Sequence, residues 1–297
     1  MNRFLIFAGA RTGSVTLSHC LRHTIASNFE VWKDPVFDEP FTEPLKLPDE
    51  LKKFMMNECF KLGIDFTLKG VRYKDSWTTS SPERGKPGRG KNTINKISIP
   101  QLYKLLDAIY DEYIGIKHIH NQNLIWFNKA LFDYAAYNGI KIIYLHRRNV
   151  YETVLSKIAS ESSNIWSLIE DGGGEKSYKD RVEAVNNAKY VPISMPRFRG
   201  NCRGLLNNTK AFEDYISHKE FTHKKVYYED LLGDDISHDQ RIERFKDILN
   251  FLDYEYNDNK EITDALLPRI KQHNKDVYAK IPNIDEVYEW IEQQSDE

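Results

Sequence analysis

The strongest constraint on the fold of this chain is an alternation of short apolar runs with longer segments of helical periodicity. The clearest apolar run, residues 141–145, is continuous, which is typical of a strand buried on both faces of a parallel sheet. Similar runs lie at residues 4–8, 66–71, 113–119 and 225–228. Helical patterns begin after residue 14 and recur at residues 100–110, 124–137, 150–160 and 241–252. The alternation predicts an α/β fold, a three-layer sandwich with a central, mostly parallel sheet flanked by helices.

We expect a single domain over residues 1–297, with a basic loop inserted at about residues 76–95. This loop is rich in Ser, Thr, Pro, Gly, Lys and Arg, and a loop of such length in a compact domain is either functional or disordered. Its basic side chains either grip an anionic acceptor or solubilise an unstructured segment. The glycines at 172–174 mark a second break in the pattern.

Composition excludes several classes of protein. The 42 Lys and Arg against 44 Asp and Glu give a net charge of −2, so a dedicated nucleic-acid binder is not expected. The three cysteines, Cys20, Cys59 and Cys202, form no C-x-x-C pair, and we find no convincing cluster of metal ligands. No window approaches the ~18 apolar residues of a membrane span. We therefore expect a cytoplasmic protein with reduced thiols and no membrane span.

The loop after the first apolar run has the chemistry of an anion cradle. A loop between a strand and a helix directs backbone N–H groups and the helix dipole at one place, and Arg11 adds a planar cationic donor. The cradle consists of Arg11, Thr12, Gly13, Ser14, Val15 and Thr16. It lacks the lysine of the ATP-binding GxxxxGK[ST] loop. An ordinary strand-to-helix turn with a serine N-cap fits the same residues equally well.

A second cationic anchor follows the run at residues 141–145. Arg147 and Arg148 stand at the end of this expected strand, where open α/β sheets bind their ligands. Ser156 follows Arg148 by eight residues, roughly two helical turns. An arginine and a serine so placed can hold one phosphate, although a surface arginine and an unrelated helical serine give the same spacing.

Together these motifs resemble the sulfotransferase family that uses 3′-phosphoadenosine 5′-phosphosulfate (PAPS). The opening loop is similar to the family's 5′-phosphosulfate loop, and Arg148 with Ser156 resembles its 3′-phosphate pair. Tyr228-Glu229-Asp230-Leu231 resembles a third motif, found at the end of a strand, and the helix at residues 245–252 looks like the family's closing helix. The C-terminal part, with Lys271, Gln272 and residues 281–287, looks like that of bacterial and marine members of the carbohydrate-modifying type.

The resemblance implies transfer of a sulfuryl group from PAPS to a hydroxyl of a small molecule or glycan. Arg11 would stabilise charge on the leaving phosphate, and Tyr228, Lys271 and Gln272 would join the loop, Arg148 and Ser156 in holding the nucleotide. For the general base, Glu39 ranks first because its Glu-Pro-Phe setting resembles the family's glutamate after the first helix. The other candidates for the base are Glu30, His118 and His120.

Two departures from the family pattern are visible. Val15 replaces a hydroxyl residue of the loop, and the family's Lys-Thr-His sequence is not reproduced around Lys117. Two other functions stay open for a chain of this pattern. One is an ATP-dependent phosphate-loop kinase, against which the missing loop lysine argues. The other is a non-catalytic binding module on the same fold.

Overall fold

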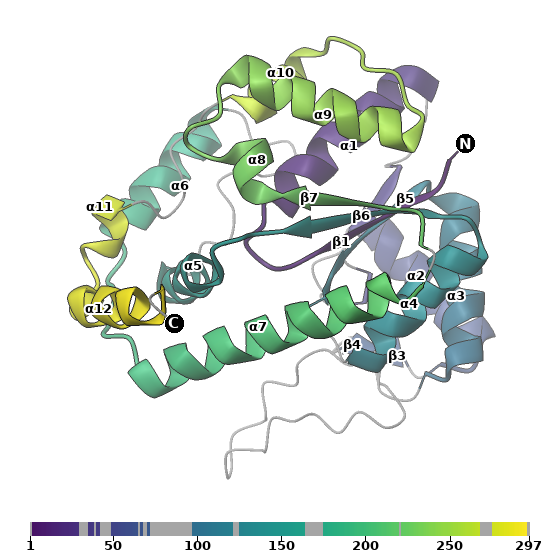
Figure 1. Cartoon of the computed structure of the whole chain (residues 1–297). Helices are drawn as coiled ribbons and strands as arrows, with labels where there is room; N and C mark the ends of the chain where they lie inside the picture. The colour runs from purple at the N-terminus through teal and green to yellow at the C-terminus, as the bar shows by residue number, and fades with distance from the viewer. Residues whose placement is uncertain are drawn as a thin grey trace.

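A computed structural model of the chain describes residues 2–29, 35–38, 40–41, 49–64, 66–67, 70–71, 97–120, 125–163, 175–219, 221–267 and 275–295. The basic loop expected at residues 76–95 and the glycines at 172–174 lie outside these residues. Figure 1 shows a central sheet with helices above and below it. The predicted α/β sandwich is therefore confirmed.

Five parallel strands form the central sheet in the order β2-β5-β1-β6-β7. The strands are β1 (Phe4–Ala8), β2 (Val36–Asp38), β5 (Gly115–Ile119), β6 (Lys141–His146) and β7 (His223–Tyr227). The middle strand is β1, in which Phe4 lies opposite Gly115 of β5 and Lys141 of β6. Because all strands are parallel, their carboxyl ends meet at one edge of the sheet.

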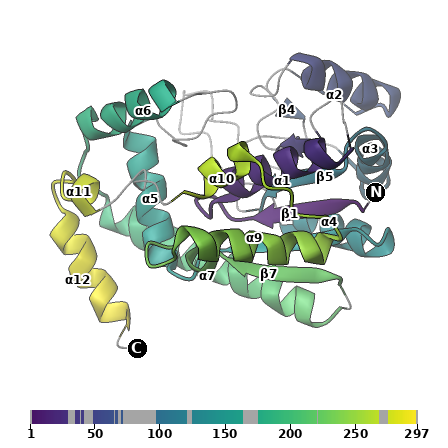
Figure 2. The same cartoon turned by 90° about the horizontal axis from the view of Figure 1, so that it is seen from above.

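Helices cover both faces of this sheet (Figures 1 and 2). One face carries α1 (Ser14–Phe29), α9 (His238–Leu252) and α10 (Lys260–Leu266). The other carries α2 (Asp49–Lys61), α3 (Ile99–Glu112), α4 (Ile125–Tyr137) and α7 (Met195–Ser217). Beyond the carboxyl ends of the strands lie α5 (Val150–Ser163), α6 (Glu175–Asn187), α11 (Lys275–Tyr278) and α12 (Ile284–Ser295), and the short α8 (Tyr228–Leu232) follows β7.

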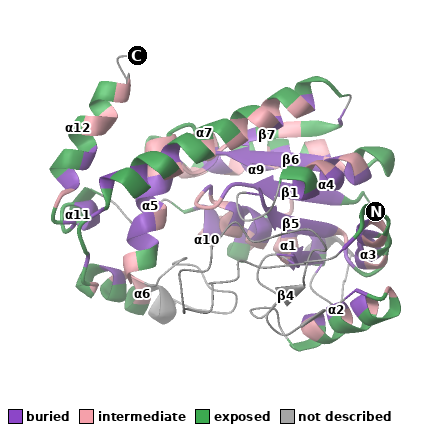
Figure 3. Cartoon of the chain, turned by 90° about the horizontal axis from the view of Figure 1, so that it is seen from below, coloured by how far each residue is buried: buried purple, intermediate pink, exposed green. Residues whose placement is uncertain are grey.

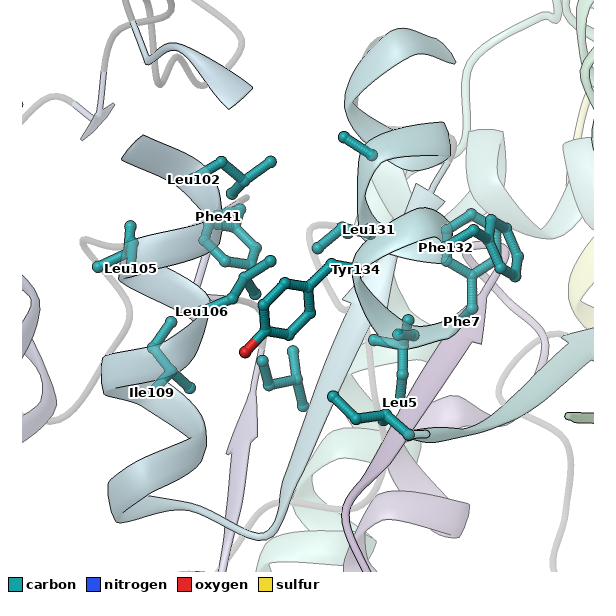
Figure 4. Close-up of a cluster of buried hydrophobic side chains, with 14 of the residues drawn as sticks. Leu5, Phe7, Phe41, Leu102, Leu105, Leu106, Ile109, Leu131, Phe132 and Tyr134 are labelled. Atoms are coloured by element: carbon teal, nitrogen blue, oxygen red, sulfur yellow. The ribbon is translucent and has the colours of Figure 1, made fainter. Parts of the chain in front are cut away.

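Side chains of β1 alternate between two hydrophobic cores, as the period of two of a β-strand requires. Phe4 and Ile6 pack with α1, α9 and α10, whereas Leu5 and Phe7 pack with α3 and α4. Figure 3 shows that β1, β5 and β6 are buried, apart from the first residue of β6, which is partly exposed. Figure 4 shows the second core, in which Phe132 of α4 lies next to Phe7 with their ring centroids 4.4 Å apart. None of the described helices combines the length and the apolar composition that crossing a membrane requires.

Two strand predictions need correction. Residues 66–71 do not form one strand of the central sheet, because β3 (Phe66–Thr67) and β4 (Gly70–Val71) pair with each other in an antiparallel ribbon. A glycine inside so short an apolar run weakens it as a continuous strand. The run at residues 225–228 begins earlier and ends earlier than expected, since β7 covers His223–Tyr227 and Tyr228 opens α8.

Replacing Phe132 by alanine tests the core beneath the site. Phe132 is fully buried, so Phe132→Ala should lower the free energy of unfolding by about 3–5 kcal/mol, measured by urea denaturation. Phe60→Ala is the matched control, because the Phe60 side chain is 87% exposed and its loss should change stability by less than about 0.5 kcal/mol. Equal effects of the two changes would contradict the packing described.

Candidate functional site

The candidate site lies where the order of the strands reverses. From β1 the chain passes to β2 on one side of the sheet, whereas from β6 it passes to β7 on the other side. In open α/β sheets, ligands bind outside the carboxyl ends of the strands at such a point. The loop from β1 to α1 and the turn from β6 to α5 therefore face each other at the position where a ligand is expected.

The loop between β1 and α1 has a conformation that only a glycine allows at its last position. Gly13 has φ +79°, and a Cβ atom placed there would lie 2.6 Å from Leu232 Cδ1 and 3.2 Å from Tyr228 Cδ2. Arg11 also has a positive φ, +67°. The hydroxyl of Thr12 donates a hydrogen bond of 2.7 Å to the Gly9 carbonyl and closes the turn. The loop is thus packed tightly against α8.

Helix α1 begins directly after this loop. The first helical hydrogen bond runs from the Leu17 N–H to the Gly13 carbonyl at 3.1 Å. The N–H groups of Ser14, Val15 and Thr16 precede that bond and have no partner within the helix ladder. They give this end of α1 a partial positive charge, so an anion is stabilised there. All six residues predicted to form the cradle are therefore placed together.

Arg11 is held in place by α5. Its Nε donates a hydrogen bond of 3.1 Å to Oγ of Ser156, which is buried. Burial lowers the pKa of Arg11 to about 10, and the positive charge of Arg147 lowers it further, whereas Tyr278 and Tyr228 act in the opposite direction. At neutral pH Arg11 therefore stays charged, although its charge is poorly solvated.

Arg147 brings a second guanidinium to the same place. Its side chain is only 6% exposed, forms an ion pair of 2.8 Å with Glu152, and lies over the ring of Tyr228 at 4.7 Å. Its Nε atom is buried and has no hydrogen-bond partner among the described residues. A buried donor without a partner costs about 1–3 kcal/mol. Tyr228 lies between this guanidinium and Gly13 and forms one wall of the site.

Arg148 is bonded to a carboxylate of α8. Its guanidinium forms two hydrogen bonds of 2.7 Å with the Asp230 carboxylate and lies 3.9 Å from the centre of the Tyr227 ring. These bonds lower the pKa of Asp230, so this carboxylate is ionised at neutral pH. The spacing of Arg148 and Ser156 predicted one shared phosphate, whereas Ser156 is bonded to Arg11. Without a ligand, the two residues therefore belong to neighbouring clusters.

Glu229 covers the start of α5. Its carboxylate oxygens accept hydrogen bonds from the backbone N–H groups of Arg148, at 3.0 Å, and Asn149, at 3.3 Å. Together with Asp230, it places two negative charges of the Tyr-Glu-Asp-Leu segment on the turn that carries Arg148. The two carboxylates of this segment therefore accept the hydrogen bonds that the guanidinium of Arg148 and the backbone N–H groups before α5 donate.

A small pocket adjoins the loop and contains two histidines. It holds about 290 Å³ of space that is partly open to solvent. Its lining includes Gly9, Thr12, His120, His146 and Arg147, with Leu205 and Thr209 contributed by α7. Nδ1 of His120 and Nε2 of His146 are buried without hydrogen-bond partners among the described residues. These two imidazoles are therefore placed to interact with a polar group that enters the pocket.

His118 does not line this pocket. Its Nε2 lies 2.7 Å from Oδ1 of Asn128, and its ring packs against Phe7 in the core. Burial lowers the pKa of His118 to about 4, that of His146 to about 3, and that of His120 well below its usual value. All three histidines are therefore neutral at pH 7, and His120 is the one of the two predicted histidines that faces the pocket.

Four predicted site residues lie outside the described part of the chain: Glu30, Glu39, Lys271 and Gln272. Sequence reasoning missed three others that the fold brings to the site. Tyr278 of α11 interacts with Arg11 and Ser156, while His146 lines the pocket and Glu152 pairs with Arg147. The position of His146 and Arg147 directly after the best-predicted strand was a usable signal, whereas nothing near Tyr278 in the sequence indicates its place.

Comparison of the chain with protein-family models, with curated proteins and with solved structures finds no match. The function is therefore inferred from the motifs of the chain and from the geometry of this site.

The three buried histidines predict how stability depends on pH. Burial lowers the pKa of all three in the folded protein well below about 6.5, the pH at which a histidine of the unfolded chain binds a proton. The unfolded state then holds more protons, so the free energy of unfolding should fall as the pH drops from 6.5 to 5, by up to about 1.4 kcal/mol per pH unit for each histidine. Urea denaturation at pH 7, 6 and 5 measures this slope.

A single substitution measures what one buried histidine contributes to this pH dependence. His146→Gln should reduce the slope by the share of one histidine, and His218→Gln, at an exposed position, is the matched control. A free energy of unfolding that does not vary between pH 6.5 and 5 would contradict the burial of neutral histidines.

Proposed function

We propose that this protein is a sulfotransferase, which moves a sulfuryl group from PAPS to a hydroxyl of a small molecule or glycan. The observation that carries the proposal is the convergence of two poorly solvated guanidinium groups, those of Arg11 and Arg147, on the loop before α1. The loop at residues 11–16, the turn that carries Arg148 and the Tyr-Glu-Asp-Leu segment, which resemble motifs of the family, lie near the carboxyl ends of β1, β6 and β7 and support the proposal.

Electrostatics favours a doubly charged ligand between these arginines. The positive charges of the two guanidiniums repel each other, and the ion pair of Arg147 with Glu152 balances this charge in part. A phosphate or sulfate placed at the start of α1 accepts hydrogen bonds from both guanidiniums and from backbone N–H groups. Its binding relieves the repulsion and satisfies the buried Nε of Arg147.

The site supplies what sulfuryl transfer needs. The hydroxyl oxygen of the acceptor forms a bond to sulfur while the bond between sulfur and the bridging oxygen breaks, and the electron pair leaves on the phosphate. Arg11 and Arg147 stabilise the charge that develops on that phosphate, as fixed charges do in phosphoryl transfer. A base takes the proton of the hydroxyl, which contributes about 10²–10⁴-fold. His120 and His146 are the described neutral bases in the adjoining pocket, and Glu39 and Glu30 stay candidates from the sequence.

Arg148 is proposed to bind the 3′-phosphate of the nucleotide. Its guanidinium is half-exposed and bonded to a single-charged carboxylate, Asp230. A phosphate carries more negative charge and offers more acceptor oxygens, so it competes with this carboxylate for the planar donor fork. Rotation of Asp230 away from Arg148 then opens the second anchor. Lys271 and Gln272 are expected to close over the same phosphate.

Titration calorimetry with adenosine 3′,5′-bisphosphate, run beside ATP with Mg²⁺, is the direct test. Saturable binding of the bisphosphate with weak or no binding of ATP supports the proposal. Preference for ATP with Mg²⁺ would favour the kinase, and binding of neither nucleotide would favour a non-catalytic module.

Removing either guanidinium should weaken bisphosphate binding strongly. A hydrogen bond to a charged group contributes about 1.5–3 kcal/mol, so Arg11→Gln and Arg147→Gln should each raise the Kd roughly 10- to 150-fold. Arg197→Gln is the matched control, because Arg197 is exposed and pairs with Glu161 at 2.5 Å, away from the loop. Unchanged affinity in both site variants, with unchanged urea midpoints, would refute the role of the two arginines.

Releasing Arg148 from its carboxylate should strengthen binding of the 3′-phosphate. Asp230→Asn removes an exposed ion pair worth about 0.2–1 kcal/mol, so the Kd for adenosine 3′,5′-bisphosphate should fall by up to about fivefold. Adenosine 5′-monophosphate lacks the 3′-phosphate, and its affinity should not change. An equal gain for both nucleotides, or a gain for neither, would contradict the assignment of Arg148 to the 3′-phosphate.

A further inference from the structure

We propose that His19, His23 and Glu261 form a binding site for a transition-metal ion of the zinc class. His19 and His23 lie on α1, and Glu261 lies on α10, which packs against α1 (Figures 1 and 2). One ligand atom from each of the three side chains lies within 4.8 Å of the other two. This site is separate from the proposed sulfotransferase function and does not depend on it.

The two histidines have the spacing that helical metal sites use. Residues four apart lie on one face of a helix, and two histidines at this spacing bind one metal ion in zinc proteases. Here the ring centroids are 4.4 Å apart and the rings are inclined by 54°. Ligand atoms about 2.0–2.2 Å from a tetrahedral zinc ion lie roughly 3.5 Å from one another. The observed separations need only small side-chain rotations to reach that value.

The donor set selects the class of metal. Imidazole nitrogen binds zinc, copper, nickel and iron well, whereas magnesium and calcium prefer oxygen ligands alone. Two imidazoles and one carboxylate are the three-ligand set of zinc sites that keep a fourth position for water. Glu261 also supplies one negative charge to balance the charge of the ion.

The surroundings leave the cluster open to a metal from solution. His19 and His23 are half-buried, and Glu261 is exposed. The basic side chains adjacent to them in the sequence are directed to other carboxylates. Arg22 pairs with Asp38 at 2.7 Å, and Lys260 pairs with Asp264.

A bound ion would join two helices of the same layer. Helix α1 follows the loop of the candidate site, and α10 contacts α1 along the face that carries both histidines. Because the third ligand comes from α10, the unfolded chain holds no preformed site, and binding stabilises the folded state. No metal-ligand cluster is expected from the sequence, because Glu261 stands far from the histidine pair along the chain.

Calorimetric titration with ZnCl₂ and CoCl₂, on full-length protein first treated with a chelator, tests the proposal. We expect saturable binding of one ion per chain and a thermal midpoint that rises with metal concentration. MgCl₂ and CaCl₂ should give neither effect. Absence of saturable zinc binding, or equal effects of zinc and magnesium, would overturn the proposal.

Substitutions locate the bound ion. His19→Ala and His23→Ala should each weaken zinc binding by at least about tenfold. Removing a residue that only supports a metal ligand already weakens binding by about 10- to 100-fold, and these two histidines are proposed to be ligands themselves. His218→Ala, at an exposed position off this face, is the matched control and should bind zinc as the unaltered protein does. If a histidine variant fails to fold, Glu261→Gln at its exposed position keeps the test decisive. Unchanged zinc affinity in Glu261→Gln and in the folded histidine variants would overturn the assignment.

Discussion

Parallel pairing of β1 with both β5 and β6 is the constraint on which the rest of this structure depends. The ring of Phe4 lies over Gly115, where a Cβ atom would come within 2.2 Å of it, so this register admits only glycine at that position. With β1 fixed in the middle, the carboxyl ends of β1, β5, β6 and β7 meet at one edge. The loop before α1, His120, Arg147 and Tyr228 then come together without any long loop having to place them.

At this edge the chain holds positive charge that its own carboxylates balance in part. Glu152 pairs with Arg147, Asp230 with Arg148, and Glu229 accepts hydrogen bonds from the backbone at the start of α5. Arg11 donates a hydrogen bond to the neutral hydroxyl of Ser156. These contacts order the guanidinium side chains in the folded protein. The conformational entropy of these long side chains is therefore lost on folding and not on ligand binding.

Local patterns in the sequence predicted the strands β1, β5, β6 and β7 of the central sheet and the helices α1, α3, α4, α5 and α9. The runs at residues 4–8 and 141–145 are strands because they are continuous and apolar, and the helix predicted at residues 241–252 is α9 with one more turn at its start. The long helix α7 was missed, since its apolar side chains contact both the sheet and α5 and give no single-sided pattern. The strand β2 was missed as well, because three residues carry too little pattern.

The sequence indicated the loop residues of the candidate site but not the partners that hold them. The six residues of the loop are adjacent in sequence, so their placement follows from one strand and one helix. Partners such as Ser156 for Arg11, or Asp230 for Arg148, come from other elements, and their choice depends on the order of the strands. The same limit applies to Glu261, which only the packing of α10 on α1 brings to the histidine pair.

A crystal structure of the protein with adenosine 3′,5′-bisphosphate would test the proposed function most directly. We expect the 5′-phosphate at the start of α1 between Arg11 and Arg147, and the 3′-phosphate on Arg148, with Asp230 turned away from that guanidinium. A nucleotide bound elsewhere, with the Arg148–Asp230 pair intact and no anion at the loop, would contradict the assignment of this edge of the sheet to the sulfuryl donor.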